Sequence, residues 1–172
     1  MGMPSETSYP SLKQCYIYTR NACCTNLHDE AIASALEGLV SSNCADNYDD
    51  LIQYFCFGCN NMQGLYVDET AKTITICPNF AARVWTGGNS DTALLSKSQN
   101  TFDDCGLMIN EEIKIQSLNY KNASEFFKDV KPPFFEGYTV VISDKGNCYD
   151  AAISTLSAGL LLLIAPFLSL LL

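Results

Sequence analysis

Two adjacent cysteines, Cys23 and Cys24, constrain the fold of this chain more than any other feature. Adjacent cysteines do not bond easily to each other, because the small ring that such a bond closes strains the peptide between them. The pair therefore predicts bridges from one point of the chain to two distant segments. Since Cys15 precedes Cys23 by only eight residues, we expect the stretch 15–24 to be the centre of a disulfide framework.

The cysteine content favours an oxidising compartment. The chain has nine cysteines in 172 residues and one histidine, His28. Disulfides are the use of cysteine that is typical of secreted chains. Zinc bound by four thiolates and a redox dithiol at Cys56-Phe-Gly-Cys59 are the alternatives, but this pair has no second pair at matching spacing and does not open a helix after a strand. We expect no metal, no cofactor and no enzymatic activity.

The charge balance limits the partners of the chain. The net charge is −9 and the pI is about 4.4. An acidic protein of this kind is repelled by nucleic acids and by anionic membranes. We therefore expect no nucleic acid among its partners, and the length of the chain predicts a single domain.

The C-terminal end, residues 151–172, carries no charge and is mostly leucine from Leu160 onward. A membrane-spanning helix is normally flanked by basic residues on the cytoplasmic side. A GPI-attachment signal needs no such flank, because the tail is removed. We predict GPI attachment at Asp150, with a true tail anchor as the alternative. The expected organisation is an N-terminal segment 1–14, a cysteine-rich domain 15–150 and the signal 151–172.

Local patterns predict an α+β fold with three to five helices and a short β-hairpin or sheet. Apolar spacing and capping residues predict helices over 27–40, from Asp46 to about Cys56, from Pro78 to Trp85, and over 124–130. Alternation around a polar turn predicts a hairpin of 64–68 with 73–77, and a further strand over 138–142. Residues 111–118 fit a strand or a helix. Asn122-Ala123-Ser124 is an acceptor triplet for N-glycosylation at Asn122.

The order of these pieces resembles the folate receptor-like family over residues 15–150. The similar segments are Asn21-Ala-Cys-Cys24, Cys56-Phe-Gly-Cys59, Cys77-Pro-Asn-Phe-Ala-Ala-Arg-Val-Trp85 and the last cysteine, Cys148, before a GPI tail. The chain is also similar to the N-terminal sterol-binding domain of Niemann–Pick type C transporters. The segments that resemble parts of that domain include Cys105-Gly106 and the stretch 122–134.

The resemblance implies a bonding pattern for eight of the nine cysteines. The implied pairs are Cys15–Cys56, Cys24–Cys59, Cys44–Cys105 and Cys77–Cys148. Cys23 would bond to a cysteine that precedes Cys15, and the sequence holds none. Residues 1–10 also lack the apolar run of a signal peptide. We expect that one missing N-terminal segment carries both the signal and the partner of Cys23; otherwise Cys23 is unpaired.

The resemblance also implies a non-catalytic binding function at the extracellular side of the plasma membrane. Family members that bind folate use several tryptophans and a carboxylate of the first helix. This chain has a single tryptophan, Trp85, and none of Asp29, Glu30 and Glu37 falls at the corresponding place. We therefore expect a different small ligand, vitamin-like or sterol-like, or a protein partner.

Aromatic residues are the candidates for a ligand pocket, since such pockets are mostly apolar. The predicted ligand-binding residues are Tyr54, Tyr66, Phe80 and Trp85, and the other aromatic candidates are Phe55, Phe126 and Phe134. The competing hypothesis is a structural surface-coat or adhesion antigen without a pocket. A cavity beside Trp85 would favour a receptor, and a filled core would favour the coat protein.

Overall fold

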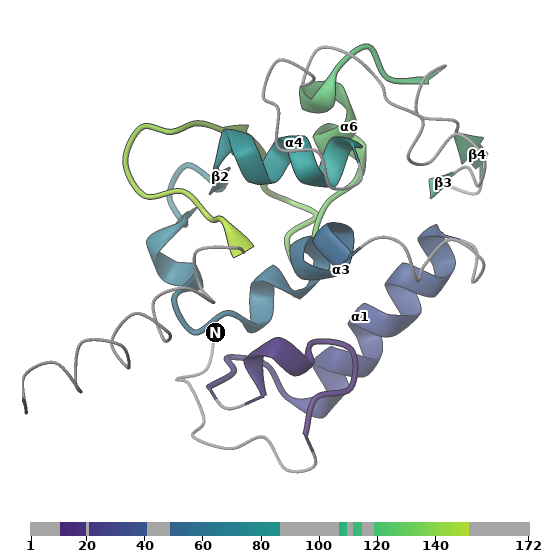
Figure 1. The fold of residues 1–172 in the computed structure, drawn as a ribbon, viewed down its shortest axis with the longest axis vertical. Coiled ribbons are helices and arrows are strands. Elements are labelled where there is room, and N and C mark those ends of the chain that lie inside the picture. The colour runs from purple at the N-terminus through teal and green to yellow at the C-terminus, as the bar shows by residue number, and fades with distance from the viewer. Residues whose placement is uncertain are drawn as a thin grey trace, which may run out of the picture.

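Helices and short strands follow one another along the chain in an α+β arrangement (Figure 1). The computed structural model describes residues 11–19, 21–40, 49–86, 107–109, 112–114 and 119–151. These residues form four α-helices, a three-stranded sheet and a two-stranded hairpin. The predicted fold class is therefore confirmed.

Helix α1 (Asn26–Leu39) begins where the sequence predicts. Thr25 is its N-cap, and the Thr25 N–H donates to Nδ1 of His28 over 3.1 Å. The buried face of the helix and its C-cap comprises Ile32, Leu36 and Val40. Leu27, the first residue of the predicted helix 27–40, is instead 77% exposed. It precedes Ile32 by five residues and so lies about 140° around the helix from it.

Helix α3 (Asp49–Phe55) continues into a 3-10 turn, η2 (Cys56–Cys59). The prediction that both cysteines lie at the end of the second helix is confirmed. The predicted helix start at Asp46 lies outside the described residues. A further 3-10 turn, η3 (Gln63–Leu65), leads into the sheet.

The three-stranded sheet has the order β1-β2-β5. Strands β1 (Val67–Asp68) and β2 (Thr73–Ile76) form the predicted hairpin, and Oδ1 of Asp68 accepts the N–H groups of Thr70 and Ala71 in the turn. Strand β5 (Thr139–Ile142) lies parallel to β2, with Thr73 opposite Thr139 and Ile76 opposite Ile142. Parallel strands need a long crossover connection, and the chain between β2 and β5 contains α4 and α6.

Helix α4 (Pro78–Thr86) starts directly after β2, with Pro78 at its first position as predicted. Its Trp85 packs edge to face on Phe126 of α6 (Ala123–Asp129), with ring centroids 5.3 Å apart. The undecided stretch 111–118 contains a strand, β4 (Glu112–Lys114), which pairs with β3 (Leu107–Ile109). Residues 87–106, between α4 and β3, lie outside the described residues.

Three disulfides link segments that are far apart in the sequence. They are Cys15–Cys56, Cys24–Cys59 and Cys77–Cys148, with Cα–Cα distances of 5.5, 4.7 and 4.9 Å. These are three of the four pairs that the resemblance implies. Cys44 and Cys105 lie outside the described residues, and Cys23 is the free cysteine of the described part.

The folded part extends past both ends of the predicted domain 15–150. Leu12 and Ala151 are each only 2% exposed and belong to the core. The remainder of the apolar tail, residues 152–172, lies outside the described residues. Within the described ranges, no helix has the length and apolar character needed to span a bilayer.

Candidate binding surface

The predicted ligand residues lie inside the fold. The side chains of Tyr54, Phe80 and Trp85 have no exposed area, and Tyr66 is half-buried. Tyr54 packs edge to face on Phe127 with ring centroids 5.2 Å apart. Aromatic pairs of this geometry stabilise a core beyond the area they bury. A ligand that touched these three rings would have to displace core side chains, so their burial disfavours the ligand-binding role, which stays a prediction.

A small surface hollow lies elsewhere, between η1 (Tyr16–Tyr18) and α3. Its volume is about 150 Å³. It is lined by Lys13, Gln14, Tyr16, Ile17, Asp49, Ile52, Gln53 and Cys56. None of the four predicted ligand residues is among them. The Cys15–Cys56 disulfide forms this feature, because it holds η1 against the end of α3.

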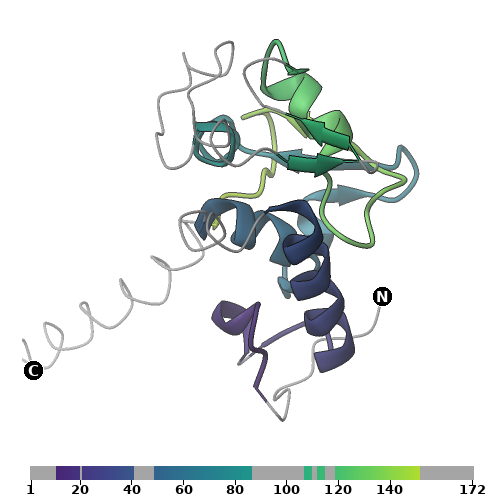
Figure 2. The ribbon, with the colours of Figure 1, turned by 90° about the vertical axis from the view of Figure 1, so that its right-hand side faces the viewer.

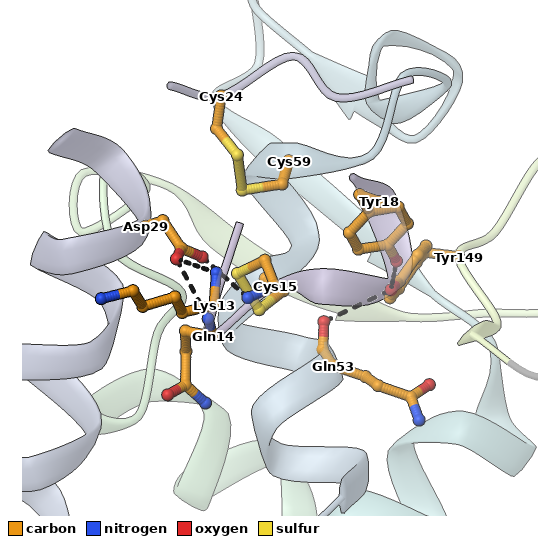
Figure 3. Close-up of a disulfide and its surroundings, with 10 residues drawn as sticks. Lys13, Gln14, Cys15, Tyr18, Cys24, Asp29, Gln53, Cys59 and Tyr149 are labelled. Atoms are coloured by element: carbon orange, nitrogen blue, oxygen red, sulfur yellow. Dashed lines mark hydrogen bonds between the residues drawn. A yellow bond between two sulfur atoms is a disulfide. The ribbon is translucent and has the colours of Figure 1, made fainter. Parts of the chain in front are cut away.

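A buried carboxylate positions the segment before η1. Asp29 of α1 is 4% exposed and accepts three backbone hydrogen bonds (Figure 3). Its Oδ2 accepts the N–H groups of Lys13 at 2.7 Å and Gln14 at 3.0 Å, and its Oδ1 accepts that of Cys15 at 2.7 Å. The sequence predicts Asp29 only as a carboxylate of the first helix, and this backbone-binding role has no signal in the sequence. These backbone groups use three of the roughly four acceptor sites of the carboxylate, so its role in this structure is to hold the segment.

Two buried tyrosines fix the other end of η1 (Figure 3). The hydroxyl groups of Tyr18 and Tyr149 are 2.5 Å apart, and that of Tyr149 also donates to the carbonyl oxygen of Gln53 over 3.3 Å. Burial raises the pKa of both tyrosines. These contacts join η1, α3 and the last part of the described chain into one rigid corner.

The hollow combines opposite charges with a small apolar floor. Lys13 and Asp49 supply one charge of each sign, and Tyr16 is 68% and Ile17 40% exposed. Pockets for vitamin-sized ligands usually measure about 300–1,000 Å³. The hollow is smaller than that, so it fits the edge of a flat contact better than an enclosed ligand.

Phe134 is a second exposed aromatic residue, and its backbone is unusual. Its φ is +71°, which a bulky side chain adopts only at a cost of about 1–3 kcal/mol. The Phe134 N–H donates to Oε1 of Glu136 over 3.1 Å, and Nζ of Lys131 donates to the Glu136 carbonyl over 2.9 Å. The ring is 48% exposed and meets that of His28 at 5.1 Å, while Phe135 is fully buried. The loop thus holds the ring of Phe134 outward and the ring of Phe135 in the core.

The predicted GPI-attachment residue, Asp150, belongs to an ion triad. Arg83 of α4 donates from Nη2 to Asp150 over 2.7 Å and from Nε to Asp50 over 3.0 Å. The three side chains are 10–20% exposed. Burial alone lowers the pKa of Arg83, but the hydrogen bonds to Asp150 and Asp50 outweigh it and raise the pKa. The triad clamps the end of the described chain to α3 and α4.

Arg83→Met will destabilise the domain by about 2 kcal/mol, because it leaves two neighbouring carboxylates without their cation. The measurement is denaturant unfolding followed by the fluorescence of buried Trp85. Lys72→Met is the matched control, since the contacts that it removes, to Glu69 and to the Tyr138 hydroxyl, are exposed. Equal losses in the two variants would contradict a structural role for the triad.

Asn122 caps helix α6, and its Oδ1 accepts the N–H of Glu125 over 3.0 Å. Ser124, the third residue of the acceptor triplet, is exposed. A glycan bonds to the other amide atom, Nδ2, so the cap and the predicted modification use different atoms of Asn122. Among the described residues, no three His, Cys, Asp or Glu side chains are grouped so as to hold a metal ion.

The core tyrosines predict a loss of stability in alkali. Burial raises the pKa of Tyr54 and of Tyr149 well above the ordinary value of 10.0. The folded state therefore holds these phenolic protons more tightly than the unfolded state does, and stability will fall as the pH rises above about 10.

The phenolate absorbance during an alkaline titration measures this effect. Tyr54→Phe should remove one late-titrating group, whereas Tyr16→Phe, the control at an exposed position, should leave the late phase intact. If the late phase were unchanged in Tyr54→Phe, the assignment to this residue would be wrong.

Comparison of the chain with protein-family models, with curated proteins and with solved structures found no match.

Proposed function

We propose that this chain is a non-catalytic binding domain of the folate receptor-like type, displayed outside the cell on a GPI anchor at Asp150. Three disulfides that close long loops support an oxidising compartment. The uncharged, leucine-rich end of the sequence supports a lipid anchor. Together they favour presentation on the cell surface.

A protein is the partner that the geometry supports best. The single observation that carries this choice is the full burial of Tyr54, Phe80 and Trp85 in the aromatic core of the described residues, because a vitamin-like or sterol-like ligand would have to displace core side chains to touch them. Phe134 offers the opposite situation, a large ring held outward by a strained loop. Aromatic anchors of this kind dominate the binding energy of protein interfaces.

Mass spectrometry of the natural membrane-bound protein tests whether the domain is disulfide-bonded and held at the cell surface by a GPI anchor. We expect the bridges Cys15–Cys56, Cys24–Cys59 and Cys77–Cys148, a glycan on Asn122, and release by phospholipase C. Free thiols at Cys56 and Cys59, or a retained leucine tail, would overturn the GPI-anchored surface domain.

Photo-cross-linking on intact cells tests whether a protein partner binds at Phe134. A cross-linker at position 134 should give a saturable product with one protein, and an excess of the released domain should compete for it. A Phe134→Ala domain should not compete, whereas a Met62→Ala domain, changed at an equally exposed residue, should.

A coat or adhesion antigen is the second candidate, because a filled core is what that hypothesis predicts. It differs from a receptor in needing no saturable partner. If no saturable product forms at position 134 while the protein is abundant and lipid-anchored, the coat protein is the better assignment.

A further inference from the structure

The last described residues are fixed to the fold. Cys148 is bonded to Cys77, and Tyr149 exchanges backbone hydrogen bonds with strand β2 and the residue after it. Asp150, the proposed attachment residue, is held by Arg83. The described fold therefore reaches Asp150 without an intervening linker.

The turn η1 lies beside the last residues of the described chain. The contact between Tyr18 and Tyr149 joins the two directly, and Tyr149 also reaches α3 at Gln53. In both views the purple η1 segment and the yellow end of the described chain lie to the left of α1 (Figure 1 and Figure 2). A lipid anchor attached at Asp150 would therefore bring η1 close to the bilayer.

The exposed chemistry of this corner suits the interfacial region of a bilayer. Tyr16 and Ile17 project from η1 with 68% and 40% of their areas exposed, and Lys13 is exposed next to them. Tyrosine is enriched at the headgroup level of membranes, and lysine extends its ammonium group to the aqueous side while its stem covers apolar surface. We name these three residues the η1 surface.

The local charge does not oppose such a contact. Arg83 neutralises one of the two carboxylates of Asp50 and Asp150, and Lys13 balances Asp49 across the hollow. The overall charge of −9 disfavours anionic lipid but is indifferent to zwitterionic lipid. A short tether also gives a high effective concentration, so a weak contact is enough to orient the domain.

We propose that the η1 surface rests on the membrane that carries the chain's own anchor, with Tyr16 and Ile17 in the headgroup region of a zwitterionic leaflet. This inference depends on the proposed lipid anchoring. It leaves Phe134 available to a partner, because Phe134 is 48% exposed and its ring lies against His28 of α1. In Figure 2 the light green loop after α6 descends beside α1.

Quenching of tryptophan fluorescence by brominated lipid tests this orientation. The natural full-length protein with its anchor is inserted into phosphatidylcholine–cholesterol vesicles that contain brominated phosphatidylcholine. Trp85 is buried and gives a constant background. We expect the fluorescence added by Tyr16→Trp to be largely lost, and that added by Phe134→Trp, the matched control, to be retained. Phospholipase C should restore the first signal.

The outcomes separate this inference from the proposed function. If the protein is anchored and released by the lipase but Tyr16→Trp is quenched no more than Phe134→Trp, the orientation is wrong and the surface display stands. If Phe134→Trp is the variant that is quenched, the opposite face rests on the membrane. If the protein does not associate with vesicles at all, both proposals fail.

Discussion

Replacing Cys77 and Cys148 together by serine will lower the free energy of unfolding by about 4 kcal/mol. The two cysteines are 71 positions apart, the longest loop closed by the described disulfides. A cross-link of this length removes much of the conformational freedom of the unfolded chain, and both residues are only partly buried, so serine fits without a cavity.

The same bridge supports the parallel pairing of β2 with β5. Both strands lie within or next to its loop, and Tyr149, directly after Cys148, bonds to the end of β2. We therefore expect the double variant to expose β5 to amide hydrogen exchange before the rest of the sheet.

Unfolding in guanidinium chloride measures the loss, with Trp85 fluorescence as the probe. Cys23→Ser is the control, since Cys23 forms no disulfide in the structure and the change should have little effect. A loss of less than about 1 kcal/mol in the double variant would mean that the Cys77–Cys148 loop is not closed in the native protein.

The elements that the sequence predicts are those formed by local patterns. Thr25 marks the start of α1, Pro78 that of α4, and alternation around Asp68 marks the hairpin, because capping and turn residues act within a few positions. The parallel partner of β5 could not be predicted, since Thr139 meets Thr73 across 66 positions and the contact depends on how α4 and α6 pack.

The sequence predicts the candidate binding surface less well than it predicts the fold. The sequence alone does not distinguish an aromatic residue that fills the core, such as Trp85, from one that is exposed to solvent, such as Phe134. The left-handed backbone of Phe134 has no sequence signature beyond the prolines before it. The hollow beside η1 arises from the Cys15–Cys56 bridge, so it becomes visible only once the cysteines are paired.

Asp29→Ala will lower the free energy of unfolding by about 3 kcal/mol or more. Three backbone N–H groups, those of Lys13, Gln14 and Cys15, donate to this buried carboxylate. Hydrogen bonds to a charged acceptor each contribute about 1.5–3 kcal/mol, and donors left unpaired in a buried site add the cost of their lost hydration. Alanine removes all three at once, while water can reach only the outer part of the segment.

Asp29→Asn should recover part of the loss, because its carbonyl oxygen still accepts from one or two of the N–H groups without the charge. Glu30→Ala is the matched control on the exposed side of the same helix turn and should change stability little. Thermal and denaturant unfolding of the four proteins measure the series. If Asp29→Ala behaved like Glu30→Ala, the segment before η1 would be held by the Cys15–Cys56 bridge alone. The corner that joins η1, α3 and the end of the described chain would then depend on covalent bonds rather than on this carboxylate.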